Sequence, residues 1–364
     1  MAWRSRISTL LWPHVGFPNM TLRQLSRRPL SVPVATSWLL ADLGEARGRQ
    51  DLHGRRSPEK LRALLQHALI ESAISSNRIE GVVVEPARVE QVVLGLSPLR
   101  DRDEQEVRGY REALSWIHES HGSIPVSVET VRRLHFLSHG QTGDAGEFKA
   151  RDSDIIERYP DGRSRVLFRT VPASETEQRM EEFVVLWAEC LSERWAPPAV
   201  ALAAANLDFL CIHPFRDGNG RVSRLLLLLM AYHLGFEVGR YVGIERLIEE
   251  NKARYYETLE QSSAGWHEGG NDPWSYVNFV LATLKSAYGE MERQVENTAS
   301  ARGSKTALVE AAIHTKAGPF SVVDLERACP GVSDMIRRVL GQLRANGEIE
   351  SLGRGPGATW RKKG

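Results

Sequence analysis

The sequence predicts an all-α protein in which a large helical core carries one β-hairpin and precedes a small C-terminal domain. Three observations lead to this prediction. Apolar residues recur at helical spacing through most of the 364 residues, one segment reads as a strand pair, and a polar break precedes the last part of the chain. A hydrophobic content of 42% is sufficient for more than one core.

Helical periodicity becomes clear from residue 57 onward. Ser57 and Pro58 are residue types that favour an N-cap and a first helical position, and an apolar stripe then continues until Gly81 ends the pattern. The sequence therefore predicts one long helix that begins at Pro58 and ends before Gly81. Further helices are predicted over residues 85–96, 107–120, 127–139, 174–191, 197–213, 220–234, 244–262 and 273–295.

One hairpin interrupts this helical pattern at residues 154–171. Short β-rich runs flank Pro160, Asp161 and Gly162, which are residues typical of a tight turn. We expect two antiparallel strands that join there.

The end of the chain predicts a separate domain. Helices are expected from Thr306, from Ser321 and from about Ser333 to Asn346, and two short strands surround a Gly/Pro turn within 348–362. Three helices and a hairpin in this space are typical of a winged helix-turn-helix domain. The predicted organisation is a partly disordered or helical N-terminal extension (1–56), a helical domain (57–298), a linker (299–304) and the winged helix-turn-helix domain (305–364).

Composition restricts the function classes. The net charge of +1 favours neither an acidic nor a basic partner for the whole chain, although both ends are more basic than the middle. The three cysteines are widely spaced, which argues against a disulfide framework and fits a reducing, cytoplasmic location. The longest apolar run, just after Arg224, is too short to span a bilayer, so no membrane association is expected.

Residues 213–221, HPFRDGNGR, place many polar residues between two apolar helices. Pro214 predicts the end of the first helix, and the second begins near Gly220. N–H groups at a helix start, with Gly218 and Gly220 free to adopt unusual dihedral angles, form an anion-binding nest. Arg221 and Arg224 lie on the first turn of that helix, where they can bind phosphate oxygens.

The same segment carries three further polar groups suited to phosphate chemistry. Asp217 offers the hard oxygen ligand that nucleotide-bound Mg²⁺ prefers. Asn219 can donate to a phosphoryl oxygen, and His213 can accept a proton from a hydroxyl nucleophile. An Asp-Gly-Asn-Gly turn alone would be ordinary turn chemistry, but the added arginines and histidine favour a site. The absence of a GxxxxGK[ST] stretch disfavours a P-loop nucleotidase.

Residues 213–224, HPFRDGNGRVSR, resemble the signature of Fic-domain proteins at every defined position: His-x-Phe-x-Asp/Glu-Gly-Asn-Gly-Arg-x-x-Arg. The resemblance extends from about Ser57 to Thr298. It implies a Fic-type, mainly helical core whose hairpin is a target-docking flap, and it places Tyr255 where the family closes its nucleotide pocket. It further implies transfer of AMP from ATP to a Ser, Thr or Tyr hydroxyl of a protein.

The resemblance also implies a role for each residue of the motif. His213 would be the general base, Asp217 the ligand of Mg²⁺ (or Mn²⁺), Asn219 part of the anion hole and Arg221 a ligand of the outer phosphates. Gly220 favours adenylylation, since relatives that act as kinases carry a bulkier residue there. The nucleotide-binding residues implied in this way are Glu80, Gly218, Asn219, Gly220, Arg221, Arg224 and Tyr255.

A second segment, SSNRIEG at 75–81, is similar to the inhibitory Ser/Thr-x-x-x-Glu-Gly/Asn motif of the family. Ser76, Glu80 and Gly81 occupy its fixed positions. The resemblance implies that Glu80 pairs with Arg224 and takes the place of the ATP γ-phosphate, so that the enzyme is auto-inhibited.

Three functional hypotheses remain open at this level. The first is an auto-inhibited protein adenylyltransferase that modifies a target or itself; the second is removal of AMP from a target by a related enzyme. The third is an ATP-sensing transcriptional regulator that binds DNA through Arg337, Arg338 and Arg344 of the winged helix, although that domain could equally bind protein or form a homodimer. The intact motif at His213 favours an enzyme, because a sensor needs no base.

Overall fold

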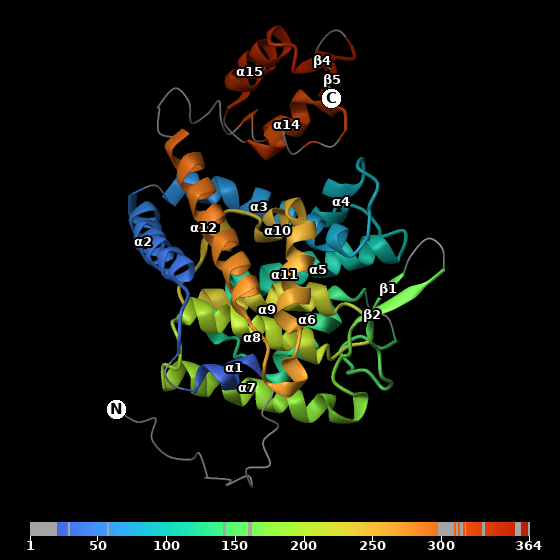
Figure 1. The fold of residues 1–364 in the computed structure, drawn as a ribbon. Helices are drawn as coiled ribbons and strands as arrows, with labels where there is room; N and C mark the ends of the chain where they lie inside the picture. Colours follow the sequence, from blue (N-terminus) through green and yellow to red (C-terminus); the bar gives the residue numbers. More distant parts are fainter. Residues whose placement is uncertain are drawn as a thin grey trace.

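The computed structural model describes most of the chain and is mainly helical, as predicted (Figure 1). The predicted N-cap Ser57, the hairpin turn at 159–161 and the linker at 299–304 lie outside the described residues. The described ranges are 20–27, 30–56, 58–140, 143–158, 162–297, 309–310, 312–313, 316, 318–329, 332–353 and 358–362.

The helices of the large domain follow one another with short connections. They are α1 (Thr21–Leu25), α2 (Val34–Arg56), α3 (Pro58–Ile79), α4 (Val89–Leu94), α5 (Arg102–Ser120), α6 (Val128–Ser138), α7 (Thr176–Ser192), α8 (Pro198–Ile212), α9 (Asn219–His233), α10 (Ile244–Glu250), α11 (Lys252–Ser263) and α12 (Trp274–Asn297). Short 3-10 turns lie at His121–Ser123, Ala173–Glu175, Val238–Arg240 and Trp266–Glu268. Among helices in the described ranges, none is both long and apolar enough to cross a membrane.

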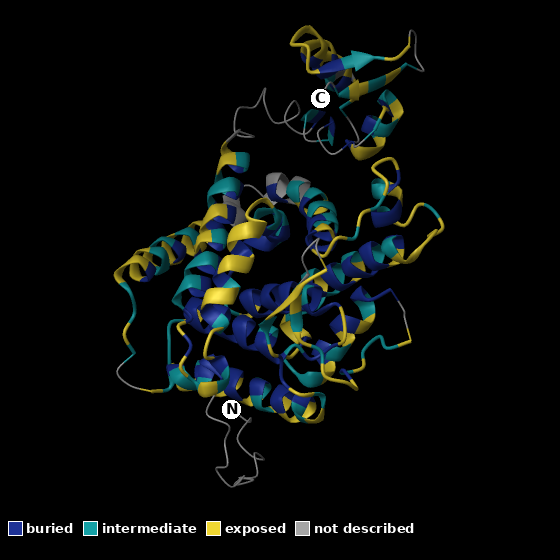
Figure 2. Ribbon diagram, turned by 45° about the vertical axis from the view of Figure 1, so that its right-hand side comes forward, coloured by how far each residue is buried: buried dark blue, intermediate teal, exposed yellow. Residues whose placement is uncertain are grey.

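Helices α8 and α9 form the centre of the domain. Both are buried along almost their whole length (Figure 2), and apart from Asn206 and Asp208 the residues of α8 are apolar on all sides, as expected of a helix enclosed by other helices. Helix α8 packs against α7, α9 and α12. The loop that joins α8 to α9 is the HPFRDGNGR segment, so the best-packed part of the protein holds both ends of this loop.

The N-terminal extension is helical where it is described, and a buried carboxylate anchors it. Asp208 of α8 accepts hydrogen bonds from the backbone N–H groups of Thr21 (2.7 Å) and Leu22 (2.9 Å). It also accepts from Trp266 Nε1 at 2.7 Å. Asp208 therefore satisfies N–H groups at the start of α1 that have no partner within the helix.

We expect the contribution of Asp208 to stability to decrease as the pH rises from about 4 to 6. Burial raises the pKa of this carboxyl to about 6, although the N–H donors around it oppose the shift. The folded protein therefore binds the proton more tightly than the unfolded chain, and the resulting stability is complete below pH 4 and lost through pH 6. The measurement is urea unfolding of wild type and Asp208→Asn between pH 4 and 7. As the pH rises from 4 to 7, the difference between their unfolding free energies should fall by up to about 3 kcal/mol. A difference that does not change with pH would show that the pKa of Asp208 is not raised.

Helix α4 covers only Val89–Leu94 of the predicted 85–96, and two other predicted helices differ as well. The helix predicted over 244–262 is broken at Asn251, whose backbone leaves the helical region and whose Nδ2 donates to Leu247 O at 2.9 Å. Helix α5 begins at Arg102 rather than near residue 107, because the Asp101 side chain caps it by accepting from Glu104 N at 2.9 Å. Neither position interrupts the apolar periodicity, which is why periodicity did not predict it.

The predicted hairpin is present and projects from the helical core (Figure 1). Strand β1 (Ile155–Arg158) pairs antiparallel with β2 (Ser164–Phe168), with an irregularity in register between Ile155 and Ile156. Arg165 of β2 forms an ion pair with Glu260 of α11 at 2.6 Å. The hairpin is thereby tied to the helix that carries Tyr255.

The described C-terminal residues have a hydrophobic core of their own. Strand β3 (Phe320–Ser321) leads into α14 (Val322–Ala328), and α15 (Ser333–Ala345) leads into β4 (Ile349–Ser351) and β5 (Thr359–Lys362). The strand order β3-β5-β4 adds one strand to the two predicted. The winged helix-turn-helix assignment stays a prediction, because only part of the first predicted helix is described. The buried apolar residues of this part are Val309, Ile313, Phe320, Leu325, Ile336, Val339, Leu340, Leu343 and Ile349.

Candidate active site

His213 ends helix α8 in a left-handed backbone conformation, with φ 53° and ψ 61°. This conformation is uncommon for a residue other than glycine. The Nδ1 atom lies 3.3 Å from Leu210 O, and because a carbonyl can only accept, Nδ1 carries the proton. The lone pair is therefore on Nε2. Burial, and then the charge of Lys149, lowers the pKa of His213 to about 4, so the imidazole is neutral at pH 7 and can accept a proton.

The turn before α9 has the backbone geometry of an anion-binding nest. Gly218 adopts φ 79°, and a Cβ at this position would lie 3.3 Å from the His135 ring, so both conformation and space require glycine. The first N–H groups of α9 have no carbonyl partners within the helix and carry its positive dipole end. An anion bound there would meet N–H donors already in position.

The Asn219 side chain holds the turn itself. Its Oδ1 accepts from Phe215 N at 2.9 Å, and its Nδ2 donates to Phe215 O at 2.8 Å. Both polar atoms of this buried side chain are therefore used inside the loop. Asn219 is available to an anion through its backbone, and its side chain maintains the loop that carries His213.

Asp217 presents an exposed carboxylate beside the nest. Partial burial favours a higher pKa, but Arg221 and the Gly218 N–H outweigh it and hold the pKa of Asp217 below its ordinary value. Arg102 Nη2 lies 3.0 Å from Asp217 Oδ2. Donor atoms of Glu106, His139 and Asp217 lie within 4.8 Å of one another. Of these three residues, Asp217 offers the ionised, accessible carboxylate that Mg²⁺ prefers, whereas Glu106 is paired with Arg102 and Arg221.

Arg221 is buried and paired in the interior. Its Nη1 lies 2.6 Å from Glu106 Oε2 and donates to Ser138 O at 3.3 Å. Glu106 also accepts from Arg102 Nε at 2.8 Å, so the pair Arg102–Glu106 connects Arg221 with the mouth of the site. Sequence reasoning missed both residues, because the helix was predicted to begin near residue 107 and neither residue was placed on it. Arg221 would have to exchange partners in order to bind an outer phosphate.

The structure brings the two residues of the predicted inhibitory contact together. Arg224 is buried; its Nε donates to Ser76 Oγ at 2.8 Å and its Nη2 to Ser76 O at 2.9 Å. The same Nη2 lies 2.8 Å from Glu80 Oε1. Burial alone would lower the pKa of Arg224, but the groups around it, the charge of Glu80 first, outweigh burial and raise that pKa above its ordinary value, so the guanidinium stays charged.

Contacts from α11 and α9 fix the end of α3 where Glu80 lies. Lys252 Nζ donates to Ile79 O at 2.6 Å, and Gly81 leaves the helix with φ 86°. A Cβ built on Gly220 would lie 2.1 Å from Glu80 Oε1. The carboxylate of Glu80 therefore lies against Gly220 at the start of α9, between that glycine and Arg224.

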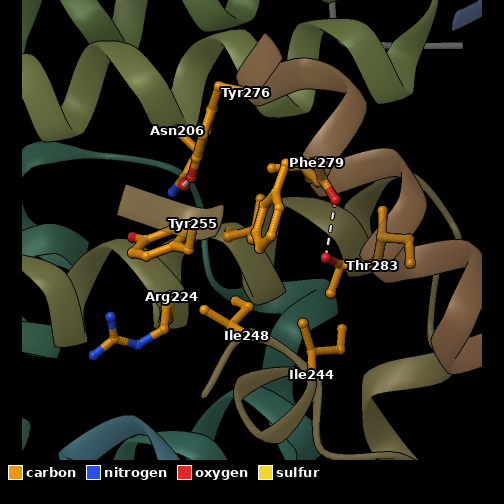
Figure 3. A pocket seen from close by; sticks show the side chains of 11 residues that line it. Asn206, Arg224, Ile244, Ile248, Tyr255, Tyr276, Phe279 and Thr283 are labelled. Carbon is orange, nitrogen blue, oxygen red and sulfur yellow. Dashed lines mark hydrogen bonds between the residues drawn. The ribbon is translucent and has the colours of Figure 1, made fainter. Parts of the chain in front are cut away.

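Tyr255 lies behind Arg224 and not at the mouth of the site. Figure 3 shows its ring beside Arg224, in a cavity between α9, α10, α11 and α12, with the guanidinium pointing away from the apolar lining. The cavity volume is about 10 Å³, room for roughly one water molecule and far too small for a nucleotide. Tyr255 is 3% exposed and supports Arg224, whereas the neighbouring Tyr256 is 44% exposed.

The fold and the loop at 213–221 define a helical domain of the Fic type. Residues 125–231 match the model of the Fic/DOC family and form a domain of that family. Among curated proteins, the chain is 22% identical over 214 residues to "Protein adenylyltransferase Fic" of Nematostella vectensis, covering 56% of this chain and 46% of that protein. It is 25% identical over 226 residues to "Protein adenylyltransferase fic-1" of Caenorhabditis elegans, covering 59% and 40%. The chain thus spans less than half the length of these relatives.

Solved structures show the same fold over a larger part of the chain. A Fic family protein from Desulfovibrio desulfuricans G20 superposes with a TM-score of 0.60 at 22% identity, and covers 93% of this chain and 98% of its own. Residues 134–508 of Fic-1 from Caenorhabditis elegans superpose with a TM-score of 0.58 at 18% identity, with coverage of 77% and 82%. These similarities confirm the predicted helical fold class.

Proposed function

We propose that this protein is a protein adenylyltransferase that moves AMP from ATP to a Ser, Thr or Tyr hydroxyl of a target protein or of itself, and that Glu80 restrains it. The observation that carries the proposal is the position of His213. His213, with its unprotonated Nε2, lies in the same short loop that leads into the anion-binding nest at the start of α9. The base and the phosphate site are therefore held by one segment of the chain. The names of the curated relatives support the same activity.

In the proposed reaction, each group of the loop has a separate role. His213 Nε2 takes the proton of the attacking hydroxyl while its oxygen forms a bond to the α-phosphorus of ATP. The bond from the α-phosphorus to the bridging oxygen breaks, and pyrophosphate leaves. The N–H groups at the start of α9 face the charge that develops on the phosphoryl oxygens. Mg²⁺ or Mn²⁺ held by Asp217 would neutralise part of the phosphate charge.

The restraint follows from the contact of Glu80 with Arg224 and the start of α9. A carboxylate at this position repels a phosphate group, and it occupies donors that the outer phosphates of ATP would otherwise use. A charge pair whose arginine is buried can change the energy of a bound state by roughly 1–3 kcal/mol. Removal of Glu80 should therefore permit a productive pose of ATP.

The position of the label distinguishes AMP transfer from phosphate transfer. The protein is incubated with Mg²⁺ and ATP labelled at either the α- or the γ-phosphate, with Glu80→Gly beside wild type. AMP transfer incorporates only the α-label into protein, whereas incorporation of the γ-label would contradict the proposal. Release of AMP from labelled protein after removal of ATP is measured in the same experiment and would show the reverse activity.

Asp217→Asn should raise the Mg²⁺ concentration needed for half-maximal transfer by about tenfold or more, because a neutral amide is a weak ligand of Mg²⁺. Transfer is measured in the Glu80→Gly background at saturating ATP over a range of Mg²⁺, with excess chelator as the zero point. Asp272→Asn, an exposed change remote from the loop, is the matched control. Undiminished transfer in chelator, or an unchanged Mg²⁺ requirement, would refute the role of Asp217.

The rate of transfer should stay constant as the pH falls from 7 to 5 and decline only near pH 4. The base must be neutral, and the pKa of His213 is lowered to about 4, so protonation inactivates it only below that value. Initial rates of Glu80→Gly are measured across this range with protein that remains folded by circular dichroism. A midpoint near pH 6.5, the ordinary pKa of histidine, would show that burial and Lys149 do not lower the pKa of His213.

A further inference from the structure

Lys149 contacts the base loop on both sides of His213, although nothing in the motif indicates it. Its backbone N–H donates to Pro214 O at 2.9 Å, and its Nζ donates to Ile212 O at 3.4 Å. One residue therefore binds the carbonyl groups immediately before and immediately after the base. The side chain is only 4% exposed, a costly position for an ammonium group.

The two hydrogen bonds from Lys149 stabilise a strained part of the loop. The left-handed backbone of His213 is unfavourable for a residue with a Cβ and persists only where the surroundings impose it. The hydrogen bond from Nδ1 to Leu210 O fixes the ring, but it does not fix the peptide groups on either side. The two bonds of Lys149 supply that constraint.

Lys149 also connects the base loop with the hairpin. Its Nζ donates to Thr170 Oγ1 at 2.7 Å, and that hydroxyl donates to Ser153 O at 2.7 Å. Ser153 and Thr170 lie at the two ends of the hairpin, just outside β1 and β2. The base of the hairpin and the base loop thus share one buried cation.

We propose that Lys149 is a positioning residue for the base: it holds the peptide groups around His213 so that Nε2 faces the incoming hydroxyl. The charge of the same ammonium disfavours the protonated imidazole. This inference rests on the proposed function. Charged groups that act on His213 are Lys149, Glu80 and Asp217, of which only Lys149 lowers its pKa. Burial lowers the pKa of Lys149 itself to about 8 against the opposing charges of Asp152 and Asp154, so it is mainly protonated at pH 7.

Two substitutions in the Glu80→Gly background separate the hydrogen bond from the charge. Lys149→Met keeps the length of the side chain without donor or charge, and Lys149→Gln keeps a donor without charge. We expect Lys149→Met to lower kcat about tenfold to a hundredfold with KM for ATP unchanged, because the nest is not altered. Lys149→Gln should lose less in kcat. Lys285→Met, at an exposed ion pair with Asp42, is the control and should match the parent.

A second readout does not depend on activity. The pKa of His213 is measured by NMR titration of the imidazole, assigned with His213→Ala, and both Lys149 variants should raise it by about 0.5–1 unit. An unchanged pKa, an unchanged kcat, or a change in KM alone would each overturn the proposal. If Lys149→Met does not fold, the kcat and the His213 pKa of Lys149→Gln are used to test the proposal. A parent that transfers no AMP would refute the proposed function, while the titration would still decide on Lys149.

Discussion

His213→Ala is expected to reduce AMP transfer by about 10²–10⁴-fold and to leave the affinity for ATP unchanged, which is the typical cost of losing a general base. In the proposed mechanism the imidazole acts on the nucleophile, whereas the backbone of α9 and the arginines bind the nucleotide. The substitution adds little backbone strain, because alanine and histidine both carry a Cβ at φ 53°, although histidine adopts this conformation more often. The loop should therefore keep its shape while the base is lost.

The measurement combines transfer and binding in the Glu80→Gly background. Incorporation of α-labelled AMP gives the rate, and calorimetric titration with ATP and Mg²⁺ gives the affinity. His233→Ala is the control, since this exposed histidine at the other end of α9 bonds only to a backbone carbonyl, His121 O at 2.9 Å. A rate within a few-fold of the parent would exclude His213 as the base, and a parallel loss of ATP affinity would indicate a damaged loop.

Glu80→Gly is expected to increase AMP transfer tenfold to a thousandfold, which corresponds to about 1.4–4 kcal/mol. The change removes the carboxylate that pairs with Arg224 and lies over Gly220. It affects only a partly exposed residue beyond the end of α3, so its effect on stability should be small. ATP should also raise the melting temperature of the variant more than that of wild type, because the freed Arg224 gains a phosphate partner.

Two further variants test the cause of this activation. Glu80→Gln keeps a side chain of the same size beside Gly220 without its charge, so it should activate less than glycine does. Glu249→Gln removes a carboxylate that pairs with Arg78 at 3.3 Å, outside the nest, and should leave the rate unchanged. Equal rates in wild type and Glu80→Gly would refute auto-inhibition. Activation by Glu249→Gln would show that loosening of α3 alone raises the rate, without removal of the Glu80 carboxylate.

Local patterns in the sequence predicted the helical fold and the location of the site. The apolar run of α8 and α9 determines where these helices lie, and Pro214 and Gly218 determine where one ends and the next begins. All polar groups of the loop are adjacent in the chain, so spacing alone brought them together. The contact between Glu80 and Arg224 was predicted as well, because a resemblance linked these two residues across 144 positions of the chain.

Residues that support the site from elsewhere in the chain were not predictable. Arg102, Glu106 and Lys149 reach the loop only through the packing of α5 and the base of the hairpin. Each would be read as an ordinary surface charge in isolation, since no local periodicity marks a partner far away in the chain. The break at Asn251 escaped prediction for a related reason: a side-chain bond to Leu247 O ends α10, while the apolar spacing continues.

The missing side chain at Gly220 has an evolutionary consequence. The space that a Cβ would fill is already taken by the carboxylate of Glu80, whose oxygen would lie 2.1 Å from that atom. Under the proposed restraint, a change of this glycine to a larger residue would push the glutamate away from its place and weaken the restraint in a single mutational step. Descendants with a side chain at this position would have less selective reason to keep the glutamate, so the two positions should diverge together.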